Sequence, residues 1–108
     1  VLNLNNMRDI DNDRQMGKQT IVVKIGLPLA KYYHYLLIII PMFLMMLYSV
    51  LNFEFRYKVL YVIAFIPLVF HLFYVKKVEN PKDFDSQLKV VALSTFLMCV
   101  LFFVGKTI

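Results

Sequence analysis

Three aspartates stand at alternate positions near the start of the chain, Asp9, Asp11 and Asp13, within a polar segment that spans residues 5–20. If this segment is helical, Asp9 and Asp13 lie four residues apart and project from one face, whereas Asp11 points away from them. Two carboxylates on one helix face repel each other unless a cation lies between them. The spacing therefore predicts a cation site at Asp9 and Asp13.

The surrounding residues favour magnesium over calcium. The alternating aspartates match the opening of an EF-hand loop, but Arg14 stands where that loop has glycine and Thr20 where it has its final glutamate. Magnesium fits better, because it binds one or two carboxylates and completes its coordination with waters and phosphate oxygens. The other phosphate charge would be met by the nearby cations Arg8, Arg14 and Lys18, with neutral groups from Asn5 and Asn6. From spacing alone, a solvated loop whose charges only cap a helix is an equal alternative.

The rest of the chain must position these residues, and its composition is typical of a membrane protein. Of its 108 residues, 60% are apolar and 18% charged, whereas soluble domains average about 45–50% apolar and about 25% charged. Three stretches contain no acidic or basic side chain, residues 32–53, 59–75 and 90–105. A membrane-crossing helix needs roughly 20 apolar residues, so the third stretch is long enough only if it is extended to 88–105 and its flanking lysines reach the interfaces. The sequence predicts an all-α polytopic membrane protein with three transmembrane helices.

Other protein classes fit the composition less well. A water-soluble bundle would need more polar chain than 108 residues provide to cover three apolar helices. The one cysteine, Cys99, excludes a scaffold of intrachain disulfides. A net charge of +5 could serve nucleic-acid binding if the cations shared one face, but they flank the apolar stretches instead. We therefore expect a lipid bilayer, and no nucleic acid, as partner.

The basic residues predict an orientation in the inner cell membrane. Nine lie before the first stretch or between the second and third, namely Arg8, Arg14, Lys18, Lys24, Lys31, Lys76, Lys77, Lys82 and Lys89. Three lie on the other side, namely Arg56, Lys58 and Lys106. Because cytoplasmic segments carry the excess of Lys and Arg, residues 1–31 are expected in the cytoplasm. Pro41 and Pro67 fall inside the stretches and are expected to kink them.

The order of the polar residues resembles the second aspartate-rich motif of the UbiA superfamily of intramembrane prenyltransferases, and most closely its 1,4-dihydroxy-2-naphthoate polyprenyltransferase branch. The resemblance covers about the first quarter of the chain, and the three apolar stretches agree with the family's last helices in number and spacing. The matching residues, in order, are Asn5, Asn6, Arg8, Asp9, Asp13, Gly17, Lys18, Thr20 and Gly26. The family's first motif, Asn-Asp-x-x-Asp-x-x-x-Asp, is absent here. We therefore expect residues 1–108 to be the carboxy-terminal part of one prenyltransferase domain, inactive without its amino-terminal helices.

The resemblance implies a reaction and roles for the motif. The complete enzyme would transfer a polyprenyl group from polyprenyl diphosphate to an aromatic acceptor, 1,4-dihydroxy-2-naphthoate in menaquinone biosynthesis for the branch named above. Departure of an allylic diphosphate is eased when Mg²⁺ and basic side chains neutralise its developing charge. Asp9 and Asp13 are implied as Mg²⁺ ligands and, with Lys18, as the catalytic residues. The diphosphate-binding residues implied are Arg8, Arg14, Lys18 and Asn6.

Alternatives remain open from sequence alone. A different UbiA-type prenyltransferase would share the motif, and a non-enzymatic membrane subunit could bind anionic lipid through its basic arm. A transporter fragment is less favoured, because the stretches show few polar or broken positions. His71 is expected to form a hydrogen bond to a neighbouring helix rather than to accept a substrate proton. Asp83 and Asp85, in the loop between the second and third stretches, are expected to form a hydrated surface.

Overall fold

The computed structural model describes residues 1–52 and 55–108, and every regular element in those ranges is helical. The α-helices are α1 (Leu2–Arg8), α2 (Ile10–Gln15), α3 (Ile21–Ile25), α4 (Leu27–Leu51), α5 (Phe65–Lys77) and α6 (Asp85–Thr107). Two 3₁₀ helices, η1 (Arg56–Ala64) and η2 (Pro81–Phe84), precede α5 and α6. The predicted all-α class is confirmed.

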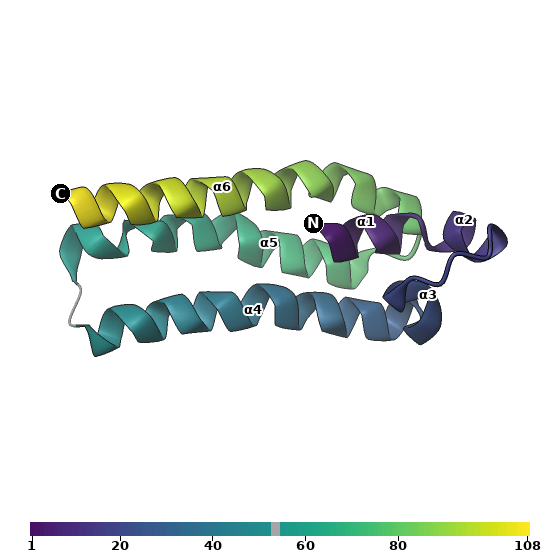
Figure 1. The fold of residues 1–108 in the computed structure, drawn as a ribbon. Coiled ribbons are helices and arrows are strands. Elements are labelled where there is room, and N and C mark those ends of the chain that lie inside the picture. The colour runs from purple at the N-terminus through teal and green to yellow at the C-terminus, as the bar shows by residue number, and fades with distance from the viewer. Residues whose placement is uncertain (53–54) are drawn as a thin grey trace.

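Three long helical rods lie side by side and alternate in direction (Figure 1). The first rod is α4, the second is η1 with α5, and the third is η2 with α6. Their segments long and apolar enough to cross a membrane are Leu27–Leu51, Lys58–Lys77 and Pro81–Thr107. The predicted number of spans is confirmed. Their bounds differ from the expected ranges, which are 32–53, 59–75 and 88–105. Residue 53 lies outside the described residues. The third segment was expected to reach a crossing length only through its extension to 88–105, but at 27 residues it is the longest.

The third segment is longer because its polar start is also helical. Asn80 caps η2 by accepting a hydrogen bond from the backbone N–H of Lys82 at 3.2 Å, and Pro81 occupies a first-turn position where its missing N–H costs nothing. The chain then passes directly into α6 at Asp85. A charge-free window detects only the apolar part of such a helix, so the sequence prediction began several residues too late.

The second rod is irregular in its first half. Nine residues from Arg56 to Ala64 form the 3₁₀ helix η1, with non-helical angles at Val59 (φ −104°, ψ 16°). Pro67 follows in the first turn of α5, where an unpaired backbone position is tolerated. Pro41, in contrast, lies within α4, which continues as one helix from Leu27 to Leu51. The irregular angles lie at Val59, eight positions before Pro67, and neither proline interrupts its α-helix.

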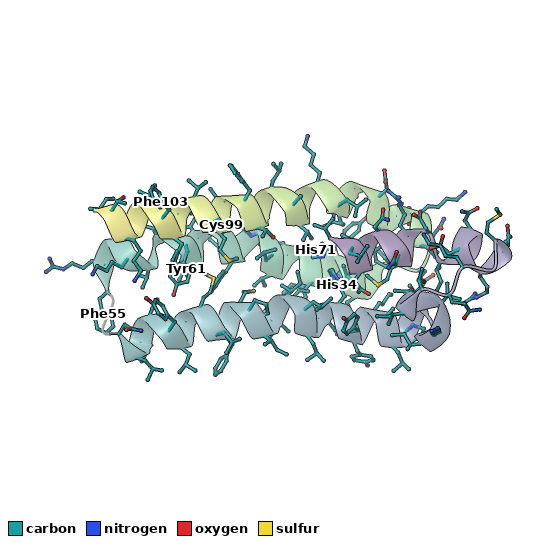
Figure 2. The ribbon with its side chains drawn as sticks, in the orientation of Figure 1. His34, Phe55, Tyr61, His71, Cys99 and Phe103 are labelled. Carbon is teal, nitrogen blue, oxygen red and sulfur yellow. The ribbon has the colours of Figure 1, made fainter. Side chains whose placement is uncertain are left out.

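The buried core lies toward the end of the bundle that carries α2 and α3, where α1 packs among the long helices (Figure 1). Leu4 and Met7 of α1, Val22 of α3 and Phe84 of η2 are all fully buried in one cluster. Large apolar side chains elsewhere point outward, including Phe103, which is 68% exposed (Figure 2). An outward apolar surface of this kind is what lipid, rather than water, accommodates.

The polar segments gather at one end of the rods. α2, α3 and the turn at η2 lie together, and the connection after α4 lies at the opposite end (Figure 1). This placement agrees with three crossings that put residues 1–31 and the loop between the second and third rods on the same side.

Candidate functional site

The aspartate segment is helical but is divided at Asp9. This residue ends α1 and precedes α2, with φ −95° and ψ 9°. Hydrogen bonds nevertheless cross the division, from Asp9 N–H to the Asn5 carbonyl at 3.1 Å and from Asp13 N–H to the Asp9 carbonyl at 2.8 Å. The single helix face assumed from sequence is therefore bent at its first aspartate.

Gly17 and Lys18 form the turn that ends α2. Gly17 has φ +73°, its N–H bonds to the Arg14 carbonyl at 3.3 Å, and the Lys18 N–H bonds to the Asp13 carbonyl at 2.8 Å. These two bonds with a left-handed glycine make a Schellman motif. The turn carries the Lys18 ammonium back to within 3.9 Å of Asp13 Oδ1. The turn at Gly17 therefore gives a structural reason for the Gly-Lys pair, because it brings the Lys18 ammonium to the Asp13 carboxylate.

Replacing Gly17 with alanine should destabilise this turn by about 1 kcal/mol, because a Cβ disfavours positive φ. A methyl group added at Gly17 would meet no other atom within 4 Å, so backbone strain is the whole effect. Thermal unfolding of the detergent-purified protein would measure it. Gly17→Asn should cost less, since asparagine tolerates this conformation, and equal effects of the two variants would contradict the turn as described.

Of the three aspartates, Asp13 is the best suited to bind a cation. The residue is only 6% exposed, and its Oδ2 has no hydrogen-bond partner among the residues that the structure describes. A buried carboxylate oxygen without a partner is costly, and such atoms are often explained by an ion or water. A divalent cation that prefers oxygen ligands fits this position.

Asp9 is held differently, by Arg8. The Arg8 guanidinium donates a hydrogen bond to each carboxylate oxygen of Asp9, from Nε to Oδ1 at 2.8 Å and from Nη2 to Oδ2 at 3.1 Å. Hydrogen bonding from Arg8, with further help from the charge of Lys18, lowers the pKa of Asp9 below its ordinary value. Asp9 is therefore ionised at neutral pH, as a metal ligand must be, but its oxygens are engaged by Arg8.

The other predicted site residues are only partly brought together. Asp11 and Arg14 are both exposed and form a loose pair at 4.0 Å. Asn6 lines a separate hollow of about 380 Å³ on the other side of α1, near Tyr33. Across the parts of the chain that are described, no three acidic, histidine or cysteine side chains are grouped to hold a metal. Within these ranges, the carboxylates available to a metal centre are therefore a pair at most.

One polar pocket adjoins the aspartate segment. It has a volume of about 390 Å³, and its lining residues are Arg8, Asp9, Asp11, Asn12, Lys82 and Asp85. Asp9 and Asp11 therefore share a pocket that Asp13 does not line, because the chain bends at Asp9. Sequence reasoning missed Lys82 and Asp85, since nothing in their spacing connects them with a segment more than 60 residues away.

A buried chain of hydrogen bonds lies deeper in the bundle. The Nε2 atoms of His34 in α4 and His71 in α5 are 2.7 Å apart, and Figure 2 shows the two rings directed toward each other. His71 Nδ1 lies 2.8 Å from Gln87 Oε1 of α6, and Asn3 Nδ2 of α1 lies 3.5 Å from His34 Nδ1. The expected bond from His71 to a neighbouring helix is confirmed.

This chain of bonds has one consistent direction if both rings are neutral. Gln87 Oε1 can only accept, so His71 donates from Nδ1 and accepts at Nε2. His34 then donates from Nε2 and accepts from the Asn3 amide at Nδ1. The four side chains fasten α1, and hence the aspartate segment, to all three long rods. His34 was missed because it lies among the tyrosines that open the first apolar stretch.

Comparison with known proteins gives sequence relatives. No protein-family model matches the chain, and no solved structure matches it. It is 31% identical over 105 residues to the 1,4-dihydroxy-2-naphthoate octaprenyltransferase of Escherichia coli (strain K12), across 97% of this chain and 34% of that protein. It is 29% identical over 108 residues to the protein of the same name from Haemophilus influenzae (strain ATCC 51907 / DSM 11121 / KW20 / Rd), across 100% of this chain and 35% of that protein. The chain thus spans about a third of the length of these curated relatives, and its resemblance to the 1,4-dihydroxy-2-naphthoate prenyltransferases is confirmed.

Proposed function

We propose that the protein containing this chain transfers a polyprenyl group from polyprenyl diphosphate to 1,4-dihydroxy-2-naphthoate, a step of menaquinone synthesis. The observation that carries the proposal is the buried carboxylate of Asp13, with one oxygen unpartnered and Lys18 beside it. That arrangement lies within a chain related over its whole length to enzymes named for this transfer.

Each motif residue has a distinct part in this proposal. Asp13, through its unpartnered Oδ2, and Asp9 would hold Mg²⁺, which when bound would withdraw negative charge from the diphosphate oxygens. Lys18 and Arg14 are exposed and can meet phosphate oxygens from the solvent side, whereas Arg8 keeps Asp9 ionised and in place. The allylic C–O bond would then break with its electron pair on the diphosphate, and the polyprenyl carbon would bond to an aromatic ring carbon. That ring carbon would lose the group it carried, a proton or, from a carboxylated carbon, carbon dioxide, and the ring would become aromatic again.

Further ligands and the substrate cavity come from outside these 108 residues. The grouping of acidic side chains in the described ranges is too small to complete a metal centre by itself. We therefore infer that other helices of the same enzyme supply the remaining carboxylates and enclose the reactive cation away from water. The experiment that tests the function is prenyl transfer by the complete enzyme after each aspartate is changed to asparagine, with and without a magnesium chelator.

The proposal also places the aspartate segment on the cytoplasmic side of the inner membrane, because of the nine-to-three division of cations. In a variant without Cys99, single cysteines at Gln15 and Asp83 should be protected from an impermeant thiol reagent in intact cells. A cysteine at Lys58 should be labelled. Labelling of Gln15→Cys and Lys58→Cys from the same side would contradict the three-crossing arrangement.

A further inference from the structure

The loop between the second and third rods reaches the aspartate segment through one ion pair. Arg8 Nη1 donates to Asp85 Oδ1 at 2.7 Å, across 77 positions of sequence. Asp85 is the first residue of α6, and it lines the 390 Å³ pocket together with Arg8 and Asp9. A loop predicted to be only a hydrated surface therefore forms one wall beside the proposed diphosphate site.

This wall is fixed in place by burial. Phe84, the residue before Asp85, is fully buried in the same cluster as Leu4 and Met7 of α1. α1 carries Arg8 at its last position, so one apolar cluster holds both partners of the ion pair. The pair is thus held in register by packing, although Asp85 itself is exposed.

Arg8 is held on three sides. Its Nε and Nη2 atoms donate hydrogen bonds to the Asp9 carboxylate, and Nη2 also donates to Asn5 Oδ1 at 2.7 Å. Its Nη1 atom donates to Asp85. A guanidinium is planar, so fixing both ends of its fork fixes the orientation of the whole group. Without Asp85, Arg8 would keep its bonds to Asp9 and Asn5 but would lose the anchor at Nη1.

We propose that Asp85 is a positioning residue for the diphosphate site, acting through Arg8 on the carboxylate of Asp9. The inference rests on the proposed function and extends it to the loop that precedes α6. Asp85 anchors the Arg8 plane, which keeps the Asp9 carboxylate directed into the pocket that all three residues line. The ligand is the diphosphate head of the prenyl substrate together with its magnesium.

Asp85→Asn in the complete enzyme tests this role. Inorganic pyrophosphate with Mg²⁺ should bind about fivefold more weakly, an effect of the size expected when one partner of a partly exposed pair is removed. Asp85→Glu should restore affinity to within about twofold. The matched control is Asp83→Asn, an exposed aspartate two positions earlier that does not line this pocket; its affinity should stay unchanged.

A double-mutant cycle shows whether Asp85 acts through Arg8. Adding Asp85→Asn to Arg8→Gln should weaken pyrophosphate binding no further than Arg8→Gln alone. Independent, multiplying effects, or an Asp85→Asn variant that matches Asp83→Asn, would overturn the inference. Loss of activity in Asp13→Asn with unchanged affinity in Asp85→Asn would reject this role alone, whereas full activity in Asp13→Asn would reject the proposed function.

Discussion

Asp13→Asn and Asp9→Asn are each expected to slow prenyl transfer by the complete enzyme roughly a hundredfold, a loss of about 3 kcal/mol of transition-state stabilisation. Asparagine keeps the size and polarity of the side chain but removes the charge that a magnesium ligand needs. Turnover of polyprenyl diphosphate at saturating acceptor measures the effect. Asp11→Asn is the matched control and should cost much less, because Asp11 is exposed and only loosely paired with Arg14.

The same variants separate diphosphate chemistry from lipid binding. Lys18→Ala should also reduce use of the diphosphate strongly, because it leaves developing negative charge unopposed. If the segment only attracted anionic lipid, neutralising an aspartate would strengthen membrane attraction, and cation changes alone would harm function. Equal tolerance of asparagine at positions 9, 11 and 13, with transfer persisting in a magnesium chelator, would remove support for the magnesium site.

His71→Leu is expected to lower the free energy of unfolding by about 2 kcal/mol, because it leaves one buried and one partly buried polar group without a partner. Gln87 Oε1 would lose its donor and His34 Nε2–H its acceptor. Both histidines are 1% exposed, so water cannot replace these bonds without opening the bundle. Thermal unfolding of the detergent-purified protein would show the change as a lower midpoint.

The control for this prediction is the pair of histidines changed together. In His34→Leu/His71→Leu no histidine donor or acceptor is left facing an apolar partner, so the double variant should cost less than the sum of the two single variants. Strict additivity would mean that the His34–His71 bond does not form in the folded protein.

The number of long helices could be predicted from sequence because a single physical requirement, enough apolar length to cross the hydrocarbon, governs all three. The residues at which these helices begin and end could not be predicted in this way. α4 begins at Leu27 and the third segment at Pro81, and in both cases capping and first-turn residues start the helix ahead of its apolar part. Hydropathy detects what lipid contacts, whereas helix starts are decided by backbone hydrogen bonds.

Part of the local geometry of the candidate site follows from short-range sequence, whereas its contacts with distant residues do not. Asp13 and Lys18 lie five positions apart, and a helix end with glycine brings them together. The contact between Arg8 and Asp85 depends instead on how η2 packs against α1, which no local pattern encodes. The bend at Asp9 likewise arises where α1 ends in the core, and it moves Asp11 into the pocket that helical spacing had assigned away from Asp9.

The 3₁₀ winding of η1 alters how far the second rod reaches. A 3₁₀ helix rises about 2.0 Å per residue against about 1.5 Å for an α-helix, so the part of η1 from Lys58 to Ala64 advances at most about 14 Å instead of about 10.5 Å, less what the non-helical angles at Val59 take away. The gain is at most about two α-helical residues. The rod with the fewest residues, 20 against 25 and 27, is thereby lengthened toward its neighbours. A more extended coil thus brings the span with the fewest residues closer to the reach of its two neighbours, so that the three rods cross the hydrocarbon with less mismatch among them.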